Sequence, residues 1–95
     1  MGESTSCNTS NRAACIVTCE ACIEDCLKAG TPAHLACVRA CRDCIDACTL
    51  ADRMEARSSP FAAQAAALCA DACEACAKAC DAAGCHGCAT ACRGC

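Results

Sequence analysis

Residues 15–26 read CIVTCEACIEDC, and the same cysteine spacing recurs in CVRACRDCIDAC at residues 37–48 and in CADACEACAKAC at residues 69–80. A shifted copy, CHGCATACRGC, occupies residues 85–95. Steps of about four, three and four residues turn roughly 400°, 300° and 400° on an α-helix, so each quartet of cysteines spans an arc of roughly 60°. Cysteine therefore fills one face of each of four predicted helices.

Residues that end and begin helices separate the quartets. Gly30 and Gly84 are typical of helix C-termini, while Thr31 and Ser59 are N-cap residues that are each followed by proline. The pattern predicts a polar tail at residues 1–10 and one helical domain at residues 11–95, with helices over residues 11–29, 32–57, 60–83 and 85–95.

The quartets are in register for an antiparallel bundle. Short turns make neighbouring helices antiparallel, so facing positions have residue numbers with a constant sum. All four quartets satisfy this condition to within one residue. The predicted fold is all-α, an antiparallel up-down-up-down four-helix bundle with a cysteine-lined core. Its layers lie about 5 Å apart and comprise Cys15/Cys48/Cys69/Cys95, Cys19/Cys44/Cys73/Cys92, Cys22/Cys41/Cys76/Cys88 and Cys26/Cys37/Cys80/Cys85.

The composition argues against several other classes of protein. Cysteine at 17 of 95 residues suggests a disulfide-bonded secreted domain, but residues 1–14 lack the apolar segment of a secretory signal. Cysteines one helical turn apart point the same way, so bridging whole rows of them would strain the bond geometry. We therefore expect reduced thiols and a cytoplasmic location. A net charge of −3, one aromatic residue and no long apolar run argue against nucleic-acid binding and membrane insertion.

An all-cysteine core points to metal chemistry. Leu, Ile or Val would stabilise a bundle better, whereas thiolate is a soft ligand for Cu(I), Zn(II) or iron–sulfur clusters. Equal numbers of Cu(I) ions and core thiolates are neutral, but one Zn(II) per layer would leave a charge of about −8 buried. Cysteines one turn apart can also approach Cu(I) from opposite sides. The sequence predicts storage of many Cu(I) ions, on the order of one per core thiol.

The whole constellation closely resembles the bacterial copper storage proteins. The resemblance covers residues 11–95 and rests on the repeated C-x-x-x-C-x-x-C-x-x-x-C with the CEAC, CRDC and ACRGC stretches. It implies a four-helix bundle that loads Cu(I) cooperatively for storage or detoxification, commonly as a homo-oligomer, and in the cytosol for members without an export signal. A copper chaperone or a small thiol would donate the metal. The short fourth helix departs from the family pattern.

Other functions stay open on the residues alone. A zinc or general metal buffer of the metallothionein type would give up copper easily and retain zinc. An iron–sulfur electron carrier would be brown and redox-active. We predict no enzymatic activity, because no C-x-x-C motif lies in a βαβ context and no catalytic triad or acid pair is present.

Several residues outside the quartets are candidates for accessory roles. His34 and His86 fall near the two turns beside one outer layer, where they are either transient metal ligands at a mouth or solvated side chains. Cys7, in the polar tail, is either a free thiol or an accessory site. Met54 has a thioether that suits a soft metal.

Two apolar groups complete the prediction. The first extends beyond the opposite outer layer and is interpreted as an apolar plug, comprising Leu50, Met54, Phe61 and Leu68. The second forms a stripe beside the cysteines, interpreted as flank packing with a subunit interface as the alternative, and comprises Ile16, Ile23, Val38 and Ile45.

Overall fold

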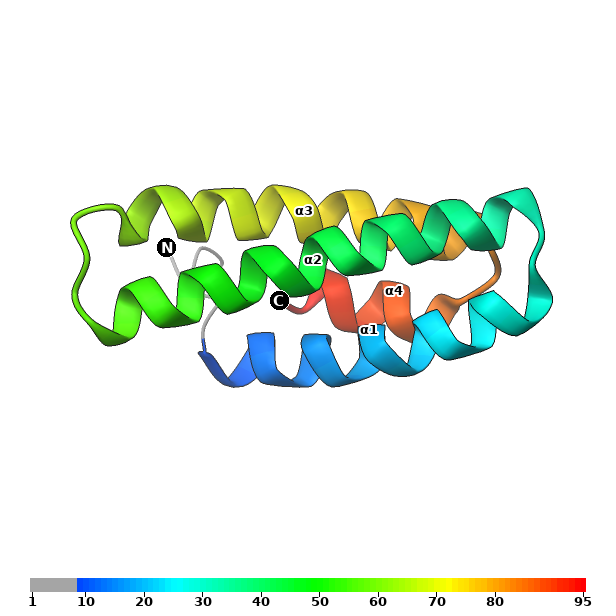
Figure 1. Ribbon diagram of the computed structural model, residues 1–95, viewed down its shortest axis with the longest axis horizontal. Helices are drawn as coiled ribbons and strands as arrows, with labels where there is room; N and C mark the ends of the chain where they lie inside the picture. Colours follow the sequence, from blue (N-terminus) through cyan, green and yellow to red (C-terminus); the bar gives the residue numbers. More distant parts are fainter. Residues whose placement is uncertain (1–8) are drawn as a thin grey trace.

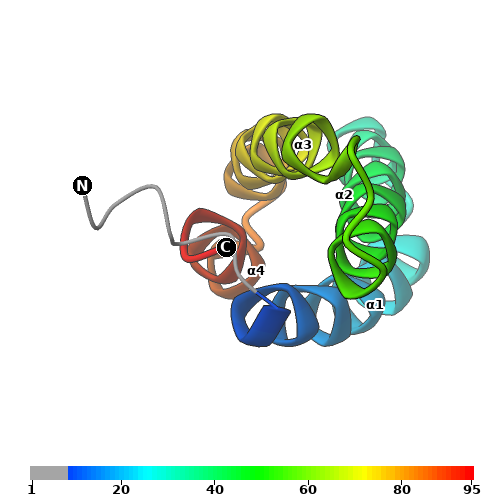
Figure 2. The same ribbon diagram turned by 90° about the vertical axis from the view of Figure 1, so that its left-hand side faces the viewer.

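The protein is a ring of four antiparallel helices. The computed structural model describes residues 9–95. In chain order the helices are α1 (Thr9–Ala29), α2 (Pro32–Ala56), α3 (Ala62–Ala82) and α4 (His86–Arg93). Each helix packs on the next, and α4 returns to α1, so the helices surround one central axis (Figures 1 and 2). The predicted all-α, up-down-up-down four-helix bundle is confirmed.

The helices differ in length, and this makes the two ends of the bundle unlike. The ribbon of α2 and α3 runs on past α1 and α4 toward the α2–α3 turn (Figure 1), and the described chain ends at the level of the middle of α2, on the opposite side of the ring (Figures 1 and 2). With 8 residues, α4 is the shortest wall of the ring, against 25 residues in α2. The other end of the bundle contains both the α1–α2 and the α3–α4 turns.

The two predicted glycine terminators adopt the backbone conformation for which glycine is suited. Gly30 has φ +70° and its N–H donates to the Cys26 carbonyl at 2.9 Å, which ends α1. Gly84 has φ +83° after α3, where the Cys85 N–H donates to the Cys80 carbonyl at 2.7 Å. This six-residue closure satisfies carbonyls that the helix leaves free. Thr31 caps α2 as predicted, since its hydroxyl accepts from the His34 N–H at 3.2 Å.

The α2–α3 turn differs from the prediction. Because Pro60 lies within the turn, α3 begins at Ala62, two residues later than expected, and its N-cap is Phe61. The turn is longer because the chain leaves α2 through Ser58, which adopts the left-handed conformation with φ +53°. The next N–H, that of Ser59, donates to the Met54 carbonyl at 2.9 Å. A serine therefore occupies a left-handed position that glycine would occupy with less strain.

The core consists of sulfur and small side chains. Ile23 and Val38 are buried, and Ile16 and Ile45 are partly buried against the cysteines, so the stripe packs within the bundle as predicted. The remaining buried hydrophobic residues are alanines, which let the helices approach closely: Ala47, Ala51, Ala65, Ala77 and Ala89.

The prediction of an apolar plug is wrong. Leu50, Phe61 and Leu68 are 38%, 59% and 52% exposed, and Met54 is half-buried. They line a shallow hollow on the outside of α2 and α3. Leu50 and Leu68 do not close the end of the core, because their positions on α2 and α3 lie away from the cysteine face. A charged residue that the sequence analysis missed is buried at this end instead.

Candidate metal centre

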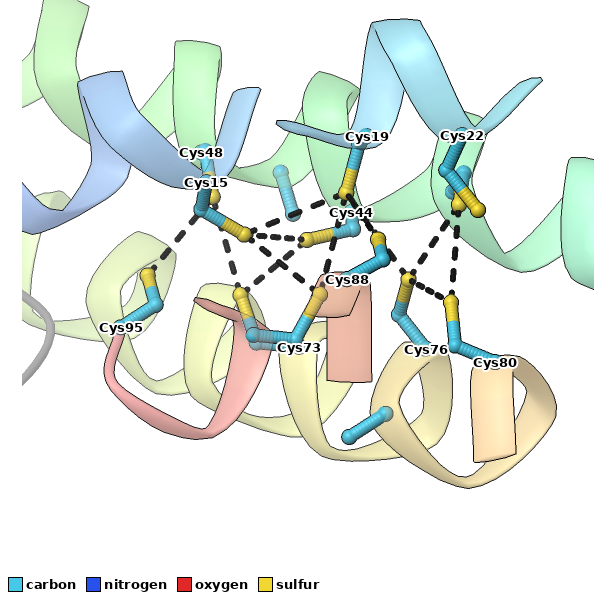
Figure 3. Close-up of a cluster of buried hydrophobic side chains, with 14 of the residues drawn as sticks. Cys15, Cys19, Cys22, Cys44, Cys48, Cys73, Cys76, Cys80, Cys88 and Cys95 are labelled. Atoms are coloured by element: carbon cyan, nitrogen blue, oxygen red, sulfur yellow. Dashed lines mark hydrogen bonds between the residues drawn. The ribbon is translucent and has the colours of Figure 1, made fainter. Parts of the chain in front are cut away.

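Sixteen thiols line the axis of the bundle, and each helix contributes one row. Fifteen of them are buried and Cys85 is half-buried. The side chains converge on the axis from opposite walls, as Figure 3 shows for Cys15, Cys44 and Cys73. All sixteen of these described cysteines have free thiol groups. The helical repeat thus converts a sequence pattern into a column of sulfur atoms, defined by the sixteen core cysteines and called the sulfur column below.

The predicted register of the cysteines is confirmed between α2 and α3, but none of the four predicted layers recurs intact as a four-sulfur set in the described chain. Facing thiols from α2 and α3 contact one another in every predicted layer, with Sγ–Sγ distances of 3.1 Å for Cys48–Cys69, 3.2 Å for Cys44–Cys73, 3.6 Å for Cys41–Cys76 and 3.1 Å for Cys37–Cys80. Facing thiols of α1 and α4 lie at 3.7 Å for Cys19–Cys92 and 3.6 Å for Cys26–Cys85.

The layers also contact each other along the axis. Cys15 Sγ lies 3.5 Å from Cys44 Sγ of the next layer, and Cys48 Sγ lies 3.7 Å from Cys73 Sγ (Figure 3). Five overlapping sets of four sulfurs have all members within 4.8 Å of one another: Cys15/Cys48/Cys73/Cys95, Cys15/Cys19/Cys44/Cys92, Cys19/Cys76/Cys88/Cys92, Cys22/Cys41/Cys80/Cys88 and Cys22/Cys26/Cys37/Cys85. Because these sets share sulfurs, the column is continuous and suits bridging thiolates better than separate four-ligand sites.

Cysteines one turn apart on the same helix form close pairs. Their Sγ–Sγ distances lie between 3.8 and 4.0 Å in five pairs: Cys15/Cys19, Cys22/Cys26, Cys37/Cys41, Cys69/Cys73 and Cys76/Cys80. With metal–thiolate bonds of about 2.3 Å, one soft metal ion between two such sulfurs would contact both. The donor set is entirely thiol, which is the ligand type that Cu(I) prefers.

The thiols resist complete deprotonation in the absence of metal. Burial raises the pKa of Cys22 and Cys26, and it raises the pKa of Cys37 to about 12. Where thiols are mutually hydrogen-bonded, a contact with Cys19 lowers the pKa of Cys15, and the same contact raises the pKa of Cys19. A thiolate is thus stabilised by neighbours that keep their protons. Filling the column with metal must therefore displace protons.

Arg12 is the charged residue that sequence reasoning missed. Its guanidinium is 0% exposed, and it donates to Asp52 Oδ1 at 2.8 Å and to the two carboxylate oxygens of Glu55 at 2.9 and 2.7 Å. The hydrogen bond to Arg12 lowers the pKa of Glu55. The hydrogen bond to Glu55 in turn raises the pKa of Arg12. This ion cluster, defined by Arg12, Asp52 and Glu55, joins α1 to α2 at the end of the bundle where the apolar plug was predicted.

Three of the predicted accessory residues, His34, His86 and Met54, lie outside the sulfur sets of the described chain. His34 Nδ1 is 2.6 Å from Thr31 Oγ1, and His86 Nδ1 is 2.8 Å from Asp81 Oδ1. Met54 packs against the edge of the core. Cys7 falls outside the described residues. Metal binding by these four residues stays a prediction.

Comparison with known proteins agrees with this geometry. A family model described as "Copper storage protein" matches residues 2–95, nearly the whole chain. No curated protein and no solved structure matched the sequence. Across residues 9–95, every helix is too short or too polar to cross a membrane.

Proposed function

The chain belongs to the copper storage protein family, and on this premise we propose that its sixteen core thiols bind Cu(I) as thiolates, at about one ion per thiol. The observation that carries this proposal is the continuity of the sulfur column. Sulfurs shared between neighbouring sets allow one thiolate to bridge two ions. A chain of bridged ions can therefore fill the whole axis.

Charge supports a monovalent metal. Arg12 is the charged residue buried among residues 10–95, and its charge is already matched by Asp52 and Glu55. Among residues 10–95, the helices therefore provide no other buried cation that could neutralise the thiolates. Each thiolate needs about one positive charge for the core to be neutral, since unpaired buried charge is strongly unfavourable. Cu(I) supplies one charge per sulfur, whereas one Zn(II) per four sulfurs supplies half of what is needed.

The biological role that we propose is non-enzymatic storage of Cu(I) in the cytoplasm. Loading would protect the cell from copper toxicity or keep a supply of the metal. A copper chaperone or a small thiol would deliver the ions, and the bundle would act as a homo-oligomer. The absence of disulfides among the sixteen described thiols is consistent with a reducing compartment.

Anaerobic titration of the reduced protein with Cu(I), followed by metal analysis, tests the proposal. We expect a plateau at about sixteen ions per chain. A variant with one layer removed, in which Cys19, Cys44, Cys73 and Cys92 are all serine, should saturate at about four ions fewer. A wild-type plateau at about four ions would contradict the bridged arrangement. Retention of Zn(II) against excess Cu(I), or a brown chromophore, would favour the buffer or the electron carrier.

A further inference from the structure

The seam between α1 and α4 contains a hollow that reaches the sulfur column. It has a volume of about 440 Å³, and its lining includes Cys22 of α1 together with Cys85 and Cys88 at the start of α4. A larger hollow of about 500 Å³ between α2 and α3 is lined by Ala, Asp and Leu residues and by no cysteine. The α1–α4 hollow therefore gives solvent a route to thiols through the side of the bundle.

Small side chains keep this seam open. Ala21 of α1 and Gly87 of α4 line the hollow from opposite walls. A Cβ atom added at Gly87 would meet no heavy atom within 4 Å, so the space over this residue is empty. The carboxylate of Asp25 also lines the hollow and favours an approaching cation.

The three thiols at the hollow connect with the rest of the sulfur column. Cys85 Sγ lies 3.6 Å from Cys26 Sγ, and Cys22 Sγ lies 3.8 Å from the same sulfur. Cys88 Sγ lies 3.8 Å from Cys19 Sγ, nearer the middle of the column (Figure 3). An ion that binds at the hollow can therefore pass from sulfur to sulfur toward both ends.

The ends of the column are better covered than this seam. At the end that contains two turns, Cys26, Cys37 and Cys80 are 0% exposed, whereas Cys85 of the same layer is half-buried. At the other end, Cys15, Cys48 and Cys69 are 0% exposed and Cys95 is 5% exposed, less than the half-buried Cys85. The most accessible sulfur, that of Cys85, therefore lies where the α1–α4 seam meets the end with two turns, and the hollow extends from it along the seam to Cys22 and Cys88 of the next layer.

We propose that Cu(I) enters and leaves through this α1–α4 hollow, with Cys85 as the first protein ligand, and the idea rests on the storage function proposed above. The step is a ligand exchange without a change of oxidation state. The Cys85 sulfur forms a bond to Cu(I) carried by a small thiol, the bond from copper to the donor sulfur breaks, and the Cys85 proton leaves with the donor thiol. The ion then moves to Cys26 or Cys22, which frees Cys85 for the next one.

Limited alkylation tests the opening without copper. The reduced apo protein, in a Cys7→Ser background so that core thiols alone compete, is treated briefly with iodoacetamide, and the modified positions are mapped by mass spectrometry. We expect Cys85 to react first, about tenfold faster than the fully buried thiols, because those react only after local unfolding. Earliest modification of Cys15 or Cys95 would indicate end-on access and overturn the proposal.

Closing the hollow tests the route. Gly87→Leu should slow transfer of Cu(I) from its bicinchoninate complex about tenfold, since uptake would then need local opening, and the final capacity should not change. Gly94→Leu, at the opposite end of α4, is the matched control and should load at the wild-type rate. Leucine is a better helix former than glycine, so α4 should persist in both variants, which circular dichroism would check.

The outcomes separate this proposal from the storage function. Wild-type uptake rates in both Gly87→Leu and Cys85→Ser, with the capacity of Cys85→Ser lower by only about one ion, would overturn entry through the hollow and leave storage intact. A wild-type chain that is alkylated first at Cys85 but takes up no copper would contradict storage while supporting the opening.

Discussion

Replacing Arg12 by alanine is expected to destabilise the metal-free bundle by about 2–3 kcal/mol. The guanidinium is completely buried and donates three hydrogen bonds to Asp52 and Glu55. Removing one partner of a fully buried ion pair costs about 3–5 kcal/mol. Here the side chains of Asp52 and Glu55 are 28% and 38% exposed, so water would rehydrate them and the loss falls below that range.

Urea unfolding followed by circular dichroism at 222 nm measures this loss, because the chain has no Trp or Tyr for fluorescence. With a slope of about 1–1.5 kcal/mol per molar urea, the midpoint should fall by about 2 M. Arg12→Lys keeps the charge but loses the bidentate contact with Glu55, so its urea midpoint should lie between those of the wild type and Arg12→Ala.

A double-mutant cycle with Glu55→Gln isolates the contact from loss of the arginine side chain itself. We expect a coupling energy of about 1–2 kcal/mol, since two of the three hydrogen bonds join these residues. A destabilisation by Arg12→Ala below about 0.5 kcal/mol, or a coupling near zero, would refute the conclusion that the ion cluster fastens this end of the bundle.

Other predictions concern pH, strain, packing and protons. Arg12 lowers the pKa of Glu55 in the folded state, so the ionised Glu55 carboxylate stabilises the fold. This stabilisation is complete above the unfolded pKa of about 4.3 and is lost as pH falls through the lower folded pKa. Glu55→Gln should therefore flatten the decline in urea midpoint between about pH 5 and 3. Ser58→Gly should raise the free energy of unfolding by about 0.5–1 kcal/mol by relieving φ +53°, measured by the same urea assay. Ala77→Leu, at a fully buried position, should lower it by about 1–3 kcal/mol, while Leu at the exposed Ala70 should change it by less than about 0.5 kcal/mol. Loading in weakly buffered solution should release about one proton per Cu(I), read with a pH indicator; release of none would mean that the thiols were already ionised.

The sulfur column could be predicted because helix periodicity determines both which cysteines share a helix face and which cysteines of neighbouring helices lie opposite each other. Once α1 to α4 are antiparallel, the pairing of Cys44 with Cys73 and of Cys37 with Cys80 follows from residue numbers alone. Gly30 and Gly84 could be placed for a comparable reason, since each takes the positive φ that ends a helix. These parts of the fold depend on local geometry that the sequence states directly.

The prediction of an apolar plug is wrong because hydrophobicity does not decide which side chains face the column at the α2–α3 end. Position around the helix decides it. Leu50 lies two residues after Cys48, about 200° around the helix, so it faces away from the column. Arg12 lies three residues before Cys15 and Ala51 three after Cys48, so both share the cysteine face, and both are 0% exposed. Position around the helix alone places Arg12 inside and Leu50 outside. The burial of Arg12 could have been predicted from Asp52 and Glu55, which supply carboxylates at the same end of the bundle.

The start of α3 could not be predicted in the same way. Ser59 followed by proline has the composition of a helix N-terminus, but Ser58 closes α2 with the positive φ expected of glycine. Proline then falls within the turn, and Ser59 Oγ accepts from the Phe61 N–H at 3.1 Å. The conformation of Ser58 depends on how α2 meets α3, which is a tertiary effect that no local motif encodes.

A core of thiols and alanines buries less apolar area than a core of leucines, so the metal-free bundle gains little stability from its interior. Metal ions that bind the folded column and not the unfolded chain would supply the difference, which couples stability to loading. Such a bundle must nevertheless stay folded while it is empty. Packed α2 and α3, fastened to α1 through Arg12, meet that need at one end. Toward the other end, Gly87 leaves open space at the α1–α4 seam beside the half-buried Cys85. Under the proposed entry route, a fastened end and an open seam would together let the bundle hold its fold without metal and still exchange ions.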